Sequence, residues 1–385
     1  MRDFDLILYG ATGYTGRLVA EYLTAAYAGT DAPRWALAGR SPDKLAQLRD
    51  ELGAPASTPL VTASSDAPES IRALAQRASV VITTVGPYSL HGATLVEACA
   101  TAGTAYVDLC GEPTWMRQMI DAHAERARTS GARIVFSCGF DSIPFDLGVL
   151  TLQEAARARF GRPCPRVMGR VRALKGGTSG GTLASLRAVQ EAAARDPFLA
   201  SLLDDPFALA PGFRGPAQPP GNAAEHDELL GVWLAPFIMA PINTKNVHRT
   251  NHLLGHAYGS DFVYDEMMVT GPGEKGKAIA EAIRRRDMLA GGPQPGEGPT
   301  REERESGSYD ILFTGLMPDG ARVEVVVTGD RDPGYGSTSK MIVESAVCLL
   351  RDVRGEGGIW TPGALMGAAL RKRLEAHAGL TFTVR

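Results

Sequence analysis

Short apolar runs alternate with amphipathic stretches over the first 140 residues of the chain. The runs predict buried strands, at residues 4–9, 35–38, 79–85, 105–109 and 133–137. The segments between them include three with the spacing of amphipathic helices, at residues 42–52, 92–101 and 114–130. Strands that alternate with helices predict an α/β fold with a doubly wound parallel sheet.

The pattern changes after residue 148. A strand at 167–174 and a helix ending near residue 195 precede three strands that we expect to be antiparallel, at 262–270, 308–314 and 322–327. Two stretches rich in proline and glycine predict surface loops, 211–222 and 291–298. We therefore expect a first domain at 1–148 and a second α+β domain, for substrate binding or dimerisation, at 149–338. Helices in the remainder, 339–385, are expected to pack back on the first domain.

A glycine-rich turn directly follows the first strand. It reads Gly-Ala-Thr-Gly-Tyr-Thr-Gly from Gly10 to Gly16, and a helical pattern follows it. Gly10 allows a tight turn, Gly13 allows the backbone to approach a pyrophosphate, and Gly16 allows the helix to lie close to the sheet. The strand before the turn and the helix after it predict a Rossmann-type dinucleotide-binding domain.

The end of the second strand distinguishes between two dinucleotides. A site for NAD places Asp or Glu there to accept from the ribose hydroxyls, whereas this chain has Arg40 and Ser41, with Lys44 one helical turn later. These donors suit a 2′-phosphate, so we predict NADP as the cofactor. Gly86 and Pro87 follow another strand, and we expect them at the same edge because ligands bind beyond the carboxyl ends of such strands.

Several polar residues near this edge are candidates for chemistry. Tyr88 and His91 follow the strand at 79–85; either side chain can donate to a carbonyl oxygen, or Tyr88 packs on the cofactor and His91 caps the next helix. A second set either transfers protons or caps helices and holds loops: Asp108, Glu112, Asp141 and Ser142.

The second domain contains two further polar segments. Lys175 precedes a run of glycine, serine and threonine that opens a helix, which predicts either an anion-binding helix terminus or a simple helix cap. Lys245, His248 and Arg249 fit one face of a helix, which either meets an acidic substrate or carrier or, as is commoner, faces solvent.

Fourteen consecutive residues, 229–242, are apolar apart from glycine and proline. This stretch is too short to span a bilayer. It fits a buried strand and turn, an acyl tunnel, a subunit contact or contact with a membrane surface.

Composition narrows the classes of function. The 385 residues carry a net charge of −3, which offers no basic field for nucleic acid. Five cysteines are widely spaced without a Cys-x-x-Cys pair, which fits a reducing cytosol and predicts no metal site. The first strand begins within a few residues of Met1, so we expect no signal peptide, no transmembrane segment and a cytoplasmic protein that can be peripheral to a membrane.

These motifs together resemble the saccharopine dehydrogenase-like oxidoreductases, and most closely their trans-acting enoyl reductase branch. The resemblance rests on segments through most of the chain, including LAGRS, CGFDSIPFDLG, APFIMAPINTKNVHRTNHLLGHAYG and GGIWTPGALMGAAL. It implies NADP binding at Gly10, Thr12, Gly13, Tyr14, Thr15, Gly16 and Arg40. It implies no particular catalytic set.

The resemblance leads to three hypotheses. The first is an NADPH-dependent reductase of an enoyl (polyketide or fatty acyl) thioester, free or bound to a carrier, with Tyr88, His91 and Lys175 as candidates for holding the enolate oxygen or supplying the proton. The second is a saccharopine dehydrogenase-like enzyme acting on an imine of an amino acid and a 2-oxo acid. The third is a non-catalytic NADP-binding partner of a synthase. A homodimer is compatible with each of them.

Overall fold

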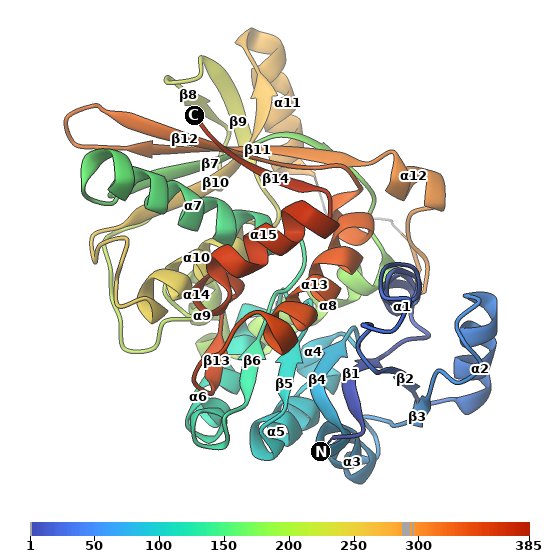
Figure 1. The fold of residues 1–385 in the computed structure, drawn as a ribbon. Coiled ribbons are helices and arrows are strands. Elements are labelled where there is room, and N and C mark those ends of the chain that lie inside the picture. The colour runs from blue at the N-terminus through green and yellow to red at the C-terminus, as the bar shows by residue number, and fades with distance from the viewer. Residues whose placement is uncertain (1, 287–292, 295) are drawn as a thin grey trace.

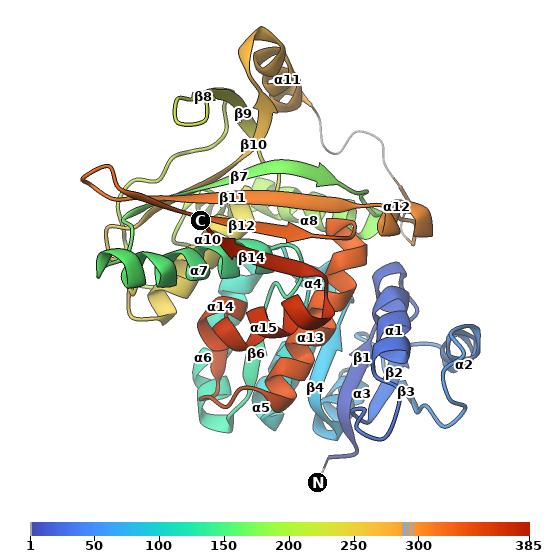
Figure 2. The ribbon, with the colours of Figure 1, turned by 45° about the horizontal axis from the view of Figure 1, so that its top comes forward.

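The computed structural model describes residues 2–286, 293–294 and 296–385, which form two sheets with helices between them (Figures 1 and 2). The first sheet is parallel throughout, and its seven strands lie in the order β13-β6-β5-β4-β1-β2-β3. Six of them come from the first 135 residues: β1 (Phe4–Tyr9), β2 (Trp35–Gly39), β3 (Leu60–Thr62), β4 (Ala78–Thr83), β5 (Ala105–Val107) and β6 (Arg133–Val135). The predicted Rossmann-type sheet is confirmed.

Helices cover both faces of this sheet. They are α1 (Tyr14–Ala26), α2 (Pro42–Glu51), α3 (Pro68–Arg77), α4 (Tyr88–His91), α5 (Ala93–Ala102) and α6 (Pro113–Ser130). One core, with Ile7 and Tyr106, lies between the sheet and α3, α5 and α6. The other face, with Leu6 and Leu8, belongs to a core that continues through to the second sheet. Burial of strands on both faces explains their unbroken apolar runs.

The second sheet is mixed, in the order β14-β12-β11-β7-β10-β9-β8. Its strands are β7 (Arg166–Lys175), β8 (Glu225–Asp227), β9 (Val232–Pro236), β10 (Val263–Gly271), β11 (Ser308–Leu316), β12 (Arg322–Gly329) and β14 (Leu380–Val384). The expectation that 262–270 is antiparallel is wrong for its pairing with β7, because the long connection between these strands returns the chain in the same direction and they pair in parallel. The antiparallel pair β11 and β12 is confirmed.

The connections of the second half contain further helices. They are α7 (Ile143–Phe160), α8 (Gly180–Arg195), α9 (Pro197–Asp204), α10 (Ala240–Leu253), α11 (Gly273–Arg285), α12 (Arg301–Glu305) and a π-helical turn, η1 (Pro333–Ser337). The loop predicted at 211–222 contains neither helix nor strand. The loop predicted at 291–298 includes residues 291, 292 and 295, which lie outside the described residues.

The last fifty residues contribute to both sheets. Helix α13 (Thr338–Arg351) packs on α1, β4 and β5, whereas β13 (Gly358–Trp360) extends the first sheet and β14 extends the second. The helices expected in the remainder of the chain also include α14 (Pro362–Leu365) and α15 (Gly367–His377), which follow each other with a break between them. Gly367 has φ +40° at the break, a backbone conformation that glycine tolerates and other residues rarely adopt.

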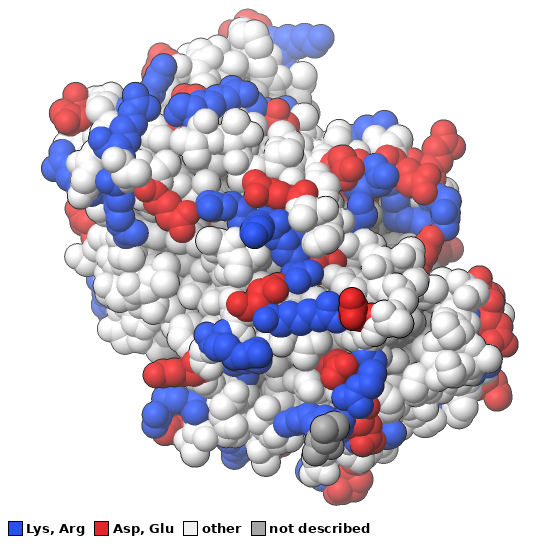
Figure 3. Space-filling model, viewed as in Figure 1, with Lys and Arg blue, Asp and Glu red and all other residues white. Residues whose placement is uncertain are grey.

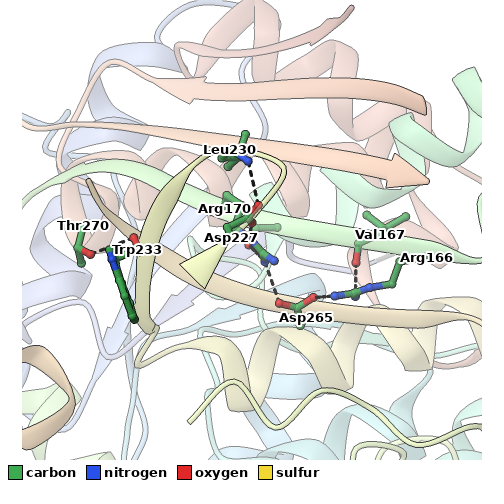
Figure 4. A network of polar contacts seen from close by, with 9 residues as sticks. Arg166, Val167, Arg170, Asp227, Leu230, Trp233, Asp265 and Thr270 are labelled. Atoms are coloured by element: carbon green, nitrogen blue, oxygen red, sulfur yellow. Dashed lines mark hydrogen bonds and ion pairs between the residues drawn. The ribbon is translucent and has the colours of Figure 1, made fainter. Parts of the chain in front are cut away.

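A buried ion-pair network joins β7, β8 and β10 within the second sheet (Figure 4). Arg170 on β7 donates from Nε to Asp227, over 2.9 Å, and from Nη1 to Asp265, over 2.8 Å. Arg166 forms a second ion pair with Asp265. Both carboxylates are at most 5% exposed and both have a cation, as buried charges require.

At the surface seen in Figure 3, acidic and basic side chains are interspersed.

Candidate active site at the carboxyl edge of the first sheet

The glycine-rich turn has the geometry that its sequence predicts. Gly10 has φ +88°, and a Cβ there would lie 2.6 Å from Val85 Cγ2. A Cβ on Gly16 would lie 2.1 Å from the carbonyl oxygen of Gly10. Helix α1 begins directly after Gly13 without a side-chain cap, so its first amides have no side-chain acceptor. An uncapped helix terminus after a close turn fits a pyrophosphate.

The basic residues at the end of β2 are exposed. Arg40 makes no hydrogen bond or ion pair within the described part of the chain, so its donors are available to a ligand. Ser41 caps α2, since its Oγ accepts from the amide of Lys44 over 3.4 Å, and its hydroxyl proton can still be donated. Lys44 is also exposed. These three side chains fit the 2′-phosphate that distinguishes NADP.

Tyr14 connects the glycine-rich turn to the second half of the chain. Its ring lies edge-on to Tyr335, and its hydroxyl contacts the carbonyl oxygen of Pro299 and accepts from Arg304 over 3.2 Å. The side chain is therefore engaged by protein groups, and the amide of Tyr14 is the part left for a cofactor. Thr12 and Thr15, the other non-glycine residues predicted for this turn, are partly buried.

Glu112 holds the loop after β4 in place through hydrogen bonds. The Glu112 carboxylate accepts from the amides of Tyr88, over 2.7 Å, and Ser89, over 2.9 Å, at the start of α4. The Tyr88 hydroxyl donates to the carbonyl of Thr83 and accepts from the amide of Leu109, and burial raises its pKa well above the usual range. The Tyr88 hydroxyl therefore has no free proton to donate to a substrate. This geometry does not support the predicted catalytic role of Tyr88, which stays a prediction.

The other two predicted catalytic residues lie on different elements. His91 ends α4 and is partly buried, close to Gly86 and Pro87 in the chain. Lys175 is exposed at the end of β7 and forms no hydrogen bond or ion pair with Tyr88 or His91. The contacts of the described residues do not join these three side chains, and their roles stay predictions.

The glycine-rich run after Lys175 is anchored by protein groups. The amide of Gly177 donates to Asp332 over 3.1 Å, and the amide of Ser179 donates to the Tyr335 hydroxyl over 2.7 Å. Further along α8, the Ser185 hydroxyl donates to the Glu112 carboxylate over 2.9 Å. The helix therefore reaches from η1 to the loop after β5, above the carboxyl edge of the first sheet.

The basic residues of α10 do not form the solvated face that sequence reasoning favoured. Lys245, His248 and Arg249 are at most 4% exposed. Lys245 donates to the carbonyl of Leu203 over 2.8 Å, and burial lowers its pKa to about 8. Arg249 donates to the carbonyls of Leu209 and Ile359. The prediction of a solvated face is wrong, because β13 and the connection that contains α9 cover this face of α10.

Among the carboxylates left open by the sequence, Asp108 holds loops. It accepts from the amides of Cys110 and Ser137, over 3.0 and 2.9 Å, and thereby ties the segment after β5 to the segment after β6.

Met239, just before α10, reaches this edge, because its Cε lies 4.0 Å from where a Cβ of Gly111 would be. The start of α10 therefore borders the carboxyl end of β5.

A buried polar cluster that sequence reasoning only partly identified lies beyond Met239. It contains Asp141, which the sequence indicated as a candidate for chemistry. It also contains Asn243, Asn246 and Glu266, which the sequence did not indicate. Asn243 donates to Glu266 over 2.9 Å, and Asn246 donates to Ser142 over 2.8 Å. A signal was present, since β10 carries adjacent carboxylates, Asp265 and Glu266, and neighbours on a strand face opposite sides of a buried sheet.

Comparisons with known proteins agree with this geometry. Residues 6–135 match the saccharopine dehydrogenase NADP binding domain. A trans-acting enoyl reductase of Mycobacterium bovis is 38% identical, with 100% of this chain and 98% of that protein covered. This chain belongs to the saccharopine dehydrogenase-like oxidoreductases, in the trans-acting enoyl reductase branch. A candidate trans-acting enoyl reductase of Mycobacterium tuberculosis is 44% identical, with 99% and 97% covered.

The fold of this oxidoreductase also matches a solved structure. Apo saccharopine dehydrogenase (L-Glu forming) from Saccharomyces cerevisiae aligns with a TM-score of 0.55 over 99% of both chains, at 10% identity, which shows a shared fold. NADP is the cofactor of the matched domain. Among the described residues, no helix is long and apolar enough to cross a membrane, and no group of His, Cys, Asp and Glu is arranged to hold a metal ion.

Proposed function

We propose that this oxidoreductase uses NADPH to reduce the carbon–carbon double bond of an enoyl thioester of polyketide or fatty acyl type. The observation that carries the proposal is the state of the basic residues of α10. Lys245 and Arg249 donate hydrogen bonds to backbone carbonyls, so they are not available to a substrate with several carboxylates. An imine of an amino acid and a 2-oxo acid requires such cations, whereas an acyl thioester does not.

Exposed apolar side chains support an acyl substrate. Leu90 on α4 is 68% exposed, Phe198 on α9 is 58% exposed and Ile238, next to Met239, is 40% exposed. Contact of an acyl chain with such side chains would be favourable, because it buries apolar surface. The relatives are named as reductases that act in trans, and we extend this to a substrate delivered on the carrier of a separate synthase.

The chain's own residues would bind and orient the cofactor. The amides after Gly13 would hold the pyrophosphate, and Arg40, Ser41 and Lys44 would hold the 2′-phosphate. Gly86 and Pro87, positioned by the contacts of Glu112 with α4, would border the nicotinamide. When bound, NADPH supplies the hydride. His91 and Lys175 remain the predicted donors to the developing enolate oxygen.

The test is NADPH oxidation, followed by absorbance, with 2-enoyl thioesters of rising chain length on coenzyme A and on a carrier protein. Turnover on the enoyl set is expected. Mixtures of 2-oxo acids and amino acids are the comparison set, and activity on those alone would assign saccharopine dehydrogenase-like chemistry instead. Tight NADPH binding with no turnover on either set would favour the non-catalytic partner.

A further inference from the structure

The cluster around Asp141 lies between the two sheets, one helical turn from the contact of Met239 with the carboxyl end of β5. Asp141 and Ser142 follow β6 and precede α7. Asn243 and Asn246 are on α10, and Glu266 is on β10. Met239 lies next to Gly111, and Asn243 is one turn, about 5 Å, further along the helix axis. The cluster therefore borders the edge where the reacting end of the cofactor is expected.

The cluster has more buried acceptors than donors. Three of its oxygens are buried and have no hydrogen-bond donor among the described residues: Asp141 Oδ1, Asn243 Oδ1 and Asn246 Oδ1. Buried polar atoms in native proteins are nearly always paired. A carboxyl group that carries a proton becomes a donor. One proton on Asp141 or Glu266 therefore supplies a donor to a cluster that lacks one.

Among the residues that the structure describes, neither of these two carboxyls forms an ion pair. Glu266 accepts from Asn243 and from the Tyr264 hydroxyl, over 2.9 and 2.8 Å, and forms no ion pair. Burial raises its pKa well above the usual range, and the nearby charge of Asp141 adds to this. Burial also raises the pKa of Asp141, to about 7. A carboxyl with a raised pKa keeps its proton to higher pH than an exposed carboxyl does.

The charged groups of the surrounding elements face elsewhere. On the opposite side of β10, Asp265 is paired with Arg166 and Arg170. On α10, Lys245 donates to a backbone carbonyl, and the His248 ring packs on Phe207 and Phe262. Asp146, further along α7, accepts from Thr250 and from the amide of Gly363.

We propose that Asp141 donates the proton to the α-carbon in the reduction proposed above. The residue that would touch the substrate is Asp141, because it is the partly exposed member of the pair, whereas Glu266 is 1% exposed. This inference rests on the proposed function.

The step balances as an ordinary reduction of a double bond. A hydride supplied by NADPH forms a C–H bond at the β-carbon, and the π electrons move towards the thioester carbonyl. The enolate then takes the proton of Asp141, which forms the second C–H bond at the α-carbon and leaves a carboxylate. A proton from solvent then restores the acid.

The experiment compares three variants of the full chain on an enoyl thioester with NADPH, between pH 5.5 and 9. Wild-type turnover is expected to fall as the pH rises through about 7. Asp141→Asn is expected to lose about 100-fold or more in kcat, with NADPH affinity within about twofold of wild type. Glu266→Gln is expected to keep most of its turnover and the wild-type fall near pH 7, because the pKa of Asp141 is raised by its own burial.

Asp146→Asn is the matched control, because burial also raises the pKa of Asp146 to about 7 but its carboxyl is bound by Thr250 and Gly363. Its turnover and pH profile are expected to match wild type. A readout independent of turnover is the infrared band of a protonated carboxyl in the free protein near pH 7. The band is expected to weaken in Asp141→Asn and Glu266→Gln.

Turnover of Asp141→Asn within threefold of wild type, with the same pH profile, would overturn the inference while leaving enoyl reduction in place. A wild-type protein that turns over no enoyl thioester would instead overturn the proposed function and the proton-donor role with it. If Asp141→Asn does not fold, a wild-type profile that stays flat from pH 6 to 9 is sufficient to reject the inference.

Discussion

Tyr14, in the glycine-rich turn, lies edge-on to Tyr335 in η1, with ring centroids 5.2 Å apart and ring planes at 80°. The Tyr335 hydroxyl also contacts the amide of Ser179 and the hydroxyl of Thr182, each over 2.7 Å. One side chain therefore couples the cofactor turn of the first sheet to the start of α8. This coupling explains why the turn, η1 and α8 meet above the same edge.

Replacing Tyr335 by Phe removes the hydroxyl and keeps the ring beside Tyr14. The buried amide of Ser179 then loses its acceptor, which should lower the free energy of unfolding by about 1–3 kcal/mol, measured by urea denaturation. Tyr258→Phe is the matched control, because the Tyr258 hydroxyl is buried, has no hydrogen-bond partner in the described part of the chain, and should cost nothing to remove. Equal stability of the two variants would contradict the anchoring role.

Replacing Arg40 by Ala should weaken NADPH binding and leave NADH binding unchanged. Loss of a charge-assisted contact with the 2′-phosphate corresponds to about 1.5–3 kcal/mol, or roughly a 10- to 100-fold higher dissociation constant. Fluorescence titration of both dinucleotides measures the effect. Arg72→Ala, at an exposed ion pair on α3, is the control. An unchanged affinity for NADPH would remove the basis for placing the phosphate at Arg40.

Replacing Arg170 by Met should destabilise the fold strongly. Asp227 and Asp265, both nearly fully buried, would lose this cation, and breaking a buried pair from one side costs about 3–5 kcal/mol. Arg72→Met removes an exposed pair and should cost less than about 1 kcal/mol. The midpoints of urea denaturation compare the two. Similar midpoints would show that the network contributes little to stability.

Stability should fall with acid in part through His248. Burial lowers its pKa from 6.5 to about 3 in the folded chain. Between these two values the unfolded chain binds a proton that the folded chain does not, so the free energy of unfolding decreases as the pH falls. His248→Gln should flatten this slope between pH 6.5 and 4.

Phe207→Leu is the control for that measurement, because it removes ring packing against His248 without removing the titratable group. It should lower stability by a similar amount at each pH and leave the slope as in wild type. Denaturation curves at several pH values give both slopes. If His248→Gln keeps the wild-type slope, acid sensitivity arises elsewhere in the chain.

Local chemistry in the sequence was sufficient for the first sheet and its glycine-rich turn. The apolar runs of β1 and β4 are long because both faces of a parallel sheet are buried, and Gly10 and Gly16 occupy positions where a Cβ would collide with the chain itself. Arg40 could be placed because it follows β2 directly. In each case the residues that make the feature predictable lie within one short stretch of the sequence.

Contacts between distant segments decided the rest. Whether β10 pairs in parallel, whether β13 and β14 join different sheets, and whether α10 hides its basic residues all depend on which segment covers which face. Glu266 and Asp141 belong to one cluster only because α10 packs on both α7 and β10 and bonds to Ser142 and Glu266. The sequence by itself determined the cofactor turn, whereas the grouping of the two carboxyls was decided by tertiary packing, because burial and proximity are properties of the folded chain.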